Sequence, residues 1–161
     1  MAKVTGRGVN QGDLVGLLVA LQNAMMSSPT LAVNAGGAAT FKTTVVPSGG
    51  IVFRINGVHY LKADLSAQVL TGFSLASTGV GQFCLLRVEL DVDGTVGIVQ
   101  GGMFSSAAEA TAHPPARSAD QATIGTILLP ASFVPGTTAL DASGVVFTDG
   151  DPDLSALQLA L

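Results

Sequence analysis

From Thr30 onward, the chain consists of short apolar runs separated by turn residues, and this pattern limits the folds that are open to it. Two of the runs, 51–55 and 58–63, flank the pair Asn56-Gly57. A two-residue type I′ turn requires positive φ at both central positions, and Asn-Gly is the pair that best tolerates this. These residues therefore predict a β-hairpin.

A second hairpin is predicted where Asp93-Gly94 separates the runs 82–92 and 95–100. Side chains of a strand point alternately to its two faces. One face of 82–92 then carries Cys84, Leu86, Val88, Leu90 and Val92, and the other carries Phe83, Leu85, Arg87, Glu89 and Asp91. The first set is apolar throughout, which favours a core-facing side.

Further strands are predicted at 40–46, 122–129 and 144–147, whereas 101–121 is rich in Ser, Ala and Pro and is interpreted as a long loop. Seven or eight short strands with hairpin turns are typical of a sandwich or jelly roll. The sequence therefore predicts a mainly β protein, with a single β-sandwich or jelly-roll-like domain over 29–161.

An extended arm (1–12) and one short helix (13–28) are predicted to precede that domain. Asp13 is a suitable N-cap, and Leu14, Leu17, Leu18, Leu21 and Met25 recur at helical spacing. Further apolar residues nearly encircle this helix, and a helix that is apolar all round is buried all round. The domain can cover one side, so we expect a neighbouring copy to cover the other, through Val15, Val19 and Met26.

Charged residues make up only 11% of the chain, against about 25% in typical soluble domains. Charge helps to keep copies of a protein apart in solution. The deficit therefore favours a subunit of an assembly, and the alternative is a monomeric secreted domain with few charges. The net charge of −4 argues against a nucleic-acid partner. The basic residues are scattered: Lys3, Arg7, Lys42, Arg54, Lys62, Arg87 and Arg117.

Cys84 is the only cysteine, so no intrachain disulfide is possible, and its apolar neighbours predict a buried thiol. Residues 1–6 lack the features of a signal peptide. The apolar segment 14–26 is shorter than the roughly 20 residues that a membrane-spanning helix needs. We therefore expect a protein with no membrane partner that is made in a cytoplasm.

Few residues are candidates for catalysis, and we expect no enzymatic activity. The histidines are His59, in a hairpin strand, and His113, before two prolines, and no Gly-x-Ser-x-Gly motif occurs. The glutamates are Glu89 and Glu109. Two carboxylates alone are weak support for glycoside hydrolysis in a chain with no Trp and one Tyr.

No cofactor or metal is predicted either. There is no P-loop and no Gly-x-Gly-x-x-Gly fingerprint. The acidic run 149–153 offers several oxygen ligands for calcium, but it lacks the spacing of an EF-hand and is interpreted as a solvated turn. Asp91 and Asp93 are interpreted as part of a hairpin turn.

Three segments resemble strands and turns of structural proteins of tailed bacteriophages: Gly50-Ile51-Val52-Phe53-Arg54-Ile55-Asn56-Gly57-Val58-His59-Tyr60, Leu86-Arg87-Val88-Glu89-Leu90-Asp91-Val92-Asp93-Gly94-Thr95-Val96 and Ala122-Thr123-Ile124-Gly125-Thr126-Ile127-Leu128. In size and composition the chain is most similar to the head decoration, or cement, proteins. The resemblance covers about residues 50–147, and its motifs have low specificity because Asn-Gly and Asp-Gly hairpins are common.

The resemblance implies a homotrimer on the outer surface of a capsid, where it clamps adjacent subunits of the major capsid protein. It implies a protein that is made in the host cytoplasm and located in the virion. Two alternatives remain open. The first is a tail or fibre component, and the second is a carbohydrate- or receptor-binding module that uses Tyr60, Phe73, Phe104 and Phe133.

Overall fold

The structure, a computed structural model, describes residues 22–46 and 49–153. Its strands are β1 (Ala24–Met25), β2 (Thr30–Val33), β3 (Thr40–Thr44), β4 (Ile51–Ile55), β5 (Val58–Lys62), β6 (Gln68–Val69), β7 (Phe83–Leu90), β8 (Val96–Phe104), β9 (Ala122–Leu129) and β10 (Val146–Asp149). A 3-10 helix, η1 (Leu70–Phe73), follows β6, and a short α-helix, α2 (Ala107–Ala112), follows β8.

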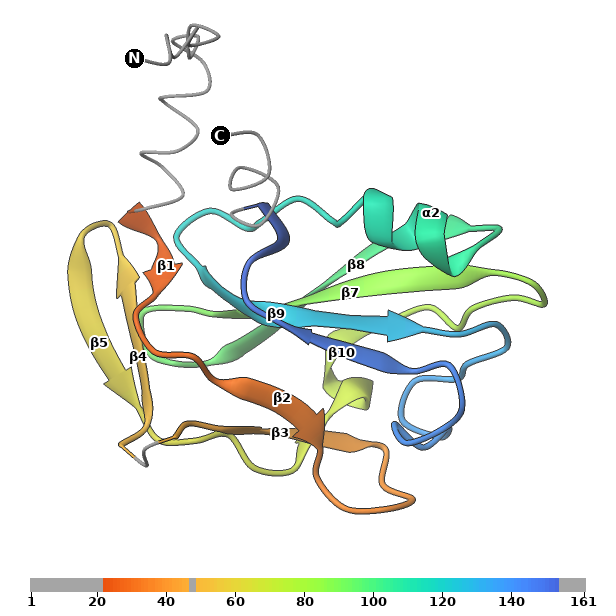
Figure 1. Ribbon diagram of the computed structural model, residues 1–161, viewed down its shortest axis with the longest axis horizontal. Coiled ribbons are helices and arrows are strands. Elements are labelled where there is room, and N and C mark those ends of the chain that lie inside the picture. Colours follow the sequence, from red (N-terminus) through yellow and green to blue (C-terminus); the bar gives the residue numbers. More distant parts are fainter. Residues whose placement is uncertain (1–21, 47–48, 154–161) are drawn as a thin grey trace, which may run out of the picture.

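These strands form three antiparallel sheets (Figure 1). The four-stranded sheet has the order β10-β9-β7-β8, and the smaller sheets have the orders β1-β4-β5 and β2-β3-β6. All three contribute to one apolar cluster, so the small sheets pack onto one face of the large sheet. The protein is thus mainly β and sandwich-like, as the sequence predicted; the finer jelly-roll assignment stays a prediction.

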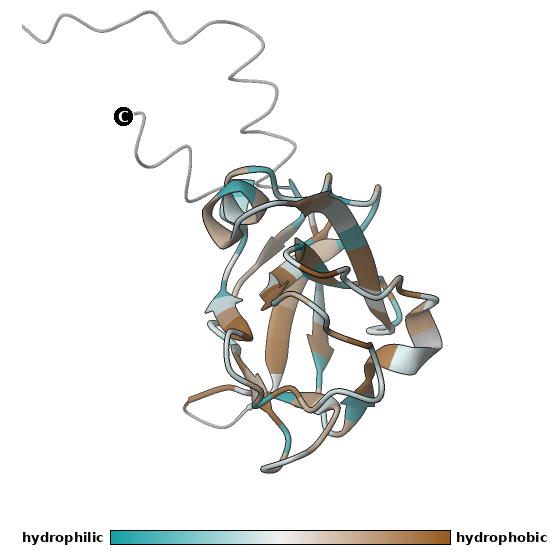
Figure 2. Ribbon diagram, turned by 90° about the vertical axis from the view of Figure 1, so that its right-hand side faces the viewer, coloured by the Kyte–Doolittle hydropathy of each residue, from teal (hydrophilic) through white to brown (hydrophobic). Residues whose placement is uncertain are grey.

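The core lies between these layers. Its largest fully buried apolar side chains are Phe41, Phe53, Phe133, Ile51, Ile55, Leu70, Leu86, Leu90, Ile124, Ile127 and Leu129. In Figure 2 the strands surround this core, and most strand segments are apolar. The predicted inward face is confirmed for Cys84, Leu86, Val88 and Leu90, which all belong to the cluster. Val92, predicted on the same face, lies beyond the end of β7 and is 43% exposed.

Both predicted hairpins are present. Asn56 and Gly57 have φ of 50° and 80°, as a type I′ turn requires, and they join β4 to β5. Gly94 has φ of 72° in the turn between β7 and β8. The Asp91 carboxylate accepts hydrogen bonds from the backbone N–H groups of Asp93 and Thr95 in this turn. Asp91 therefore has the structural role that was predicted.

The second face of the four-stranded sheet is covered as well. Leu85 and Leu128 on this face pack with Ala110 of α2 in a second apolar cluster. The prediction of a long loop over 101–121 is wrong in its first half, because β8 extends to Phe104 and α2 follows at Ala107–Ala112. The missed signal is Ser106-x-x-Glu109, a helix-start pattern that the richness in Ser, Ala and Pro concealed.

We expect the substitution Ser106→Ala to lower the free energy of unfolding by about 1 kcal/mol. Ser106 Oγ accepts the backbone N–H of Glu109 at 3.2 Å, so alanine leaves that donor of the first helical turn without its cap. Urea denaturation measures the loss. Ser66→Ala is the control, since the exposed Ser66 hydroxyl makes no hydrogen bond to the described residues. If both variants had the same free energy of unfolding, the Ser106 cap would contribute nothing to stability.

The predicted helix over 13–28 needs a correction at its end. Residues 13–21 lie outside the described residues and Gln22 is helical, but Ala24–Met25 is strand β1, paired with Arg54 and Phe53 of β4. A continuous apolar run does not by periodicity alone distinguish a helix from a strand. Here the strand conformation is favoured because β4 supplies backbone hydrogen-bond partners to Ala24 and Met25, which the predicted helix had included.

Of the helices in the described part of the chain, none has the length and apolar character that crossing a membrane would require.

Candidate functional site

The acidic run 149–153 is bonded to the rest of the fold and is not the solvated turn that we predicted. Asp149 Oδ1 accepts the backbone N–H of Leu31 at 2.7 Å. Asp151 is only 8% exposed and lies between two arginines, Arg87 at 3.1 Å and Arg117 at 3.2 Å. A buried carboxylate has to be paired, and no local pattern in the sequence indicates that distant arginines supply the partners.

Arg87 is the centre of this arrangement, which we call the Arg87 cluster (Arg87, Arg117, Asp151 and Asp153). The Arg87 side chain is fully buried on the outer face of β7. Its Nε donates to the carbonyl of Pro115 at 2.8 Å, its Nη1 contacts Asp151, and its Nη2 contacts Asp153 at 3.2 Å. The guanidinium therefore ties the connection after α2 and the last described turn to the sheet.

Arg117 extends the cluster to the start of the described chain. Its Nη1 donates to the carbonyl of Asn23 at 2.8 Å and to Asp151 Oδ2. One side chain thus joins the first described residues to the last ones. Arg87 and Arg117 are far apart in the sequence, and the fold brings both to the Asp151 carboxylate. With its carboxylates and guanidinium groups bonded to one another, the cluster is suited to holding segments together and not to proton transfer.

The two glutamates have separate structural roles. Glu89 is fully buried, and its carboxylate accepts the backbone N–H of Ser118 at 3.1 Å. Glu109 lies in the first turn of α2 and accepts the hydroxyl of Ser105. Each carboxylate stabilises local structure, so the pair offers no support for a glycosidase.

The histidines likewise lie on different elements. His59 is exposed on β5 opposite Arg54. His113 ends α2, where its ring stacks on Phe104 with 5.2 Å between the ring centroids. No group of three or more His, Cys, Asp or Glu side chains suited to a metal ion occurs in residues 22–46 and 49–153.

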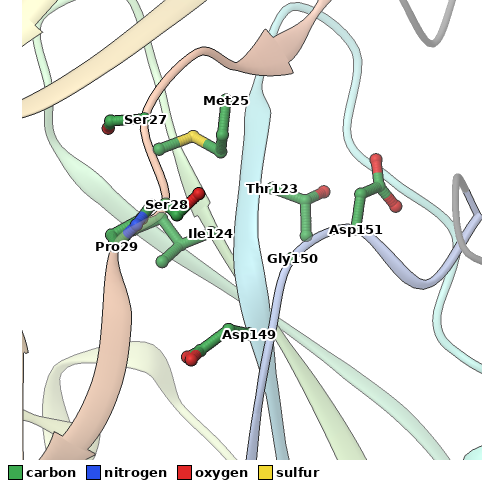
Figure 3. Close-up of a pocket in the computed structure, with 9 residues that line it drawn as sticks. All are labelled: Met25, Ser27, Ser28, Pro29, Thr123, Ile124, Asp149, Gly150 and Asp151. Atoms are coloured by element: carbon green, nitrogen blue, oxygen red, sulfur yellow. The ribbon is translucent and has the colours of Figure 1, made fainter. Parts of the chain in front are cut away.

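A pocket of about 310 Å³ opens beside the acidic run (Figure 3). One wall comes from the connection between β1 and β2, the other from β9 and the end of β10; the lining residues are Met25, Ser27, Ser28, Pro29, Thr123, Ile124, Asp149, Gly150 and Asp151. In Figure 3 the carboxylates of Asp149 and Asp151 point away from each other. Both already have bonded partners, and no aromatic platform lines the pocket.

The aromatic residues considered for sugar binding contribute mainly to the core. Phe133 is 1% exposed, and Tyr60 stacks on the buried Phe53 with 5.5 Å between ring centroids. Phe104 packs on the cluster beneath α2, and only Phe73 of η1 adds a further half-buried ring. The contacts of these four rings do not place them together on one surface, so they give no support to a sugar-binding site.

Cys84 is buried, as predicted. Burial raises the pKa of its thiol, although contacts with Gln100 and the carbonyl of Gly101 partly offset this. Its Sγ lies 3.5 Å from that carbonyl oxygen. A protonated, enclosed thiol acts as a small apolar side chain.

Large apolar side chains are nevertheless exposed elsewhere: Met26, Val46, Val58, Leu61, Val69, Val80, Val92, Val134 and Val146. Among the predicted contact residues, Met26 is 51% exposed, whereas Val15 and Val19 lie outside the described residues. Met26 N donates to the carbonyl of Val52, and Val52 pairs with the exposed Leu61. Met26 is therefore placed beside other apolar side chains on the β1-β4-β5 sheet.

A scan against protein-family models and searches of curated proteins and of solved structures find no match to this chain.

Proposed function

We propose that this chain is a non-enzymatic virion structural protein: a capsid decoration, or cement, protein that binds as a homo-oligomer over subunits of the major capsid protein. The observation that carries the proposal is where the few charges lie. Arg87, Glu89 and Asp151 are buried, so the surface carries even less charge than the composition indicates. Large apolar side chains such as Leu61 and Val80 are exposed instead. A surface of this kind suits contacts with other protein faces.

Such a protein acts through buried surface and needs no chemistry. A stable protein contact buries about 1,200–2,000 Å² in total. Many copies over a shell would add such contacts together and resist internal pressure. The resemblance implies three copies per unit, and it implies a place on the capsid surface after synthesis in the host cytoplasm.

We expect the purified chain to form an oligomer in solution, with a mass of at least twice its 16.1 kDa, because uncovered apolar surface favours self-association. Light scattering coupled to gel filtration, over a range of loading concentrations, measures the mass. Quantification of the chain in purified virus particles then tests the location. Hundreds of copies per particle support a shell protein, and absence from the particle contradicts the proposal.

Two alternatives give different results in these measurements. A tail or fibre component would be present in a handful of copies per particle. A carbohydrate- or receptor-binding module would bind one sugar consistently on a glycan array. If the chain is monomeric and binds one sugar in this way, the carbohydrate- or receptor-binding module replaces the proposed function.

A further inference from the structure

The exposed edge of the four-stranded sheet is formed by β8, the longest strand of the described chain. Nine residues in extended conformation span about 30 Å. β8 pairs with β7 on one side, and no backbone hydrogen bond joins it to any other part of residues 22–46 and 49–153. Within the described part of the chain, alternate N–H and C=O groups along its outer side therefore have no strand partner, and another strand could pair with them.

This edge lacks the features that usually protect an exposed strand. Val96–Phe104 contains no Lys, Arg, Asp, Glu or Pro, although charged residues and proline commonly prevent edge-to-edge pairing. The other edge strands differ in length or in charge: β1, β2 and β6 have only two, four and two residues. β5 carries His59 and Lys62, and β10 lies beside β2, where Asp149 accepts the backbone N–H of Leu31. β8 combines length with the absence of charge.

The core is also incompletely covered along β8. Val96, Ile98 and Met103 pack against the main apolar cluster, yet each remains partly exposed. Between Ile98 and Met103, the Gln100 side chain is tied to the neighbouring segment, because its amide forms two hydrogen bonds of 2.8 Å with the backbone of Ala76. A further strand beside β8 would cover the three apolar side chains and remove them from water.

We propose that β8 is a dimerisation edge, which pairs antiparallel with β8 of a second copy and joins two four-stranded sheets into one. A second copy fits because a two-fold contact places the same strand opposite itself. An uncharged strand can do this without opposing like charges. This inference rests on the proposed function, in which copies of the chain associate, and it makes the unit a dimer in place of the trimer that the resemblance implies.

The first test measures hydrogen–deuterium exchange of the full-length protein at two concentrations, with sedimentation velocity at the same concentrations. We expect a species of twice 16.1 kDa that dissociates on dilution, and amides of 96–104 that lose protection as it does so. Exchange in β9, which is paired on both sides, should not depend on concentration.

The second test places a charge on the edge. Gly102 is exposed on β8, and a Cβ there would first meet the Phe104 ring at 3.2 Å, so the ring would have to move by a few tenths of an ångström. We expect Gly102→Lys to remain folded by circular dichroism and to lose the dimer at concentrations where the parent keeps it. Val80→Lys, at a 93% exposed position outside β8, is the control and should stay dimeric.

The outcomes separate this inference from the proposed function. If the parent associates in a way that does not involve β8, the exchange rates of the 96–104 amides do not depend on concentration and Gly102→Lys still associates. In that case the β8 contact is wrong and the proposed function stands. Dissociation by Val15→Asp with Val19→Asp would then place the contact in the segment 13–28. A parent that is monomeric at every concentration overturns both. If Gly102→Lys fails to fold, the exchange measurement on the parent decides.

Discussion

The substitution Arg87→Ala is expected to lower the free energy of unfolding by about 3–5 kcal/mol, the usual effect of removing one partner from a buried ion pair. Arg87 is fully buried, and its loss leaves the 8% exposed Asp151 with Arg117 as its arginine partner among the described residues. Bonds to the Pro115 carbonyl and to the Thr123 hydroxyl disappear as well. Urea denaturation at one fixed protein concentration measures the effect, because association also contributes to stability.

Three variants identify the physical cause. Arg87→Lys keeps the charge but not the fork of donors, so it should recover only part of the loss. Arg117→Ala should cost less than Arg87→Ala, since the Arg117 side chain is 13% exposed and water can replace part of its contacts. Arg87→Met with Asp151→Leu should be more stable than Arg87→Ala, because no buried carboxylate then lacks its main partner. A loss below about 1 kcal/mol for Arg87→Ala would mean that the cluster is hydrated in solution.

The cluster also has a consequence for the proposed assembly. Arg117 and Asp151 join Asn23 to the last described turn, so the first and the last described residues lie at one corner of the fold. A variant that opens the cluster would release Asn23 from this turn. If the segment 13–28 contacts a neighbouring copy, as the sequence predicted, opening the cluster weakens that contact without altering any residue in it.

The hairpins could be predicted from sequence because their signals are local. Asn56-Gly57 specifies a turn through its own backbone preferences, and the alternation along β7 identifies the side that faces the core. The Arg87 cluster could not be predicted in this way. Arg87 is 64 and 66 positions from the two aspartates, and Arg117 is 34 positions from Asp151, so only the pairing of β7, β9 and β10 brings them together.

The same limit explains the errors at β1 and α2. Ala24–Met25 continues an apolar helical pattern, but β4 offers it a backbone partner, and a contact distant in sequence decides the conformation. At α2, composition suggested a loop, whereas the apolar surface of Leu85 and Leu128 stabilises a short helix above it. Local rules describe the turns well, and they fail where the partner lies elsewhere in the chain.

The second large effect is expected at Gly125 of β9, which faces the backbone of β10 in the same sheet and Leu31 of β2 in the other layer. A Cβ at this position would lie against the carbonyl oxygen of Thr148 and 2.7 Å from Leu31 Cδ1, with Asp149 Cα at 3.2 Å. Two of these three atoms belong to the backbone of β10, which cannot move without disturbing its pairing with β9. We expect Gly125→Ala to lower the free energy of unfolding by about 2–3 kcal/mol and Gly125→Val by more.

Gly36→Ala is the matched control for Gly125→Ala. Its nearest neighbour would be Asp141 Oδ2 at 3.8 Å, an ordinary contact. Both substitutions reduce the freedom of the unfolded chain equally, which on its own stabilises a protein by about 0.4–1 kcal/mol. Gly36→Ala should therefore be neutral or slightly stabilising, and the difference between the two midpoints in urea measures the clash at Gly125. If both variants were equally stable, β2 and β10 would not approach β9 as closely as the structure places them. The shared core that defines the sandwich would then be open on that side.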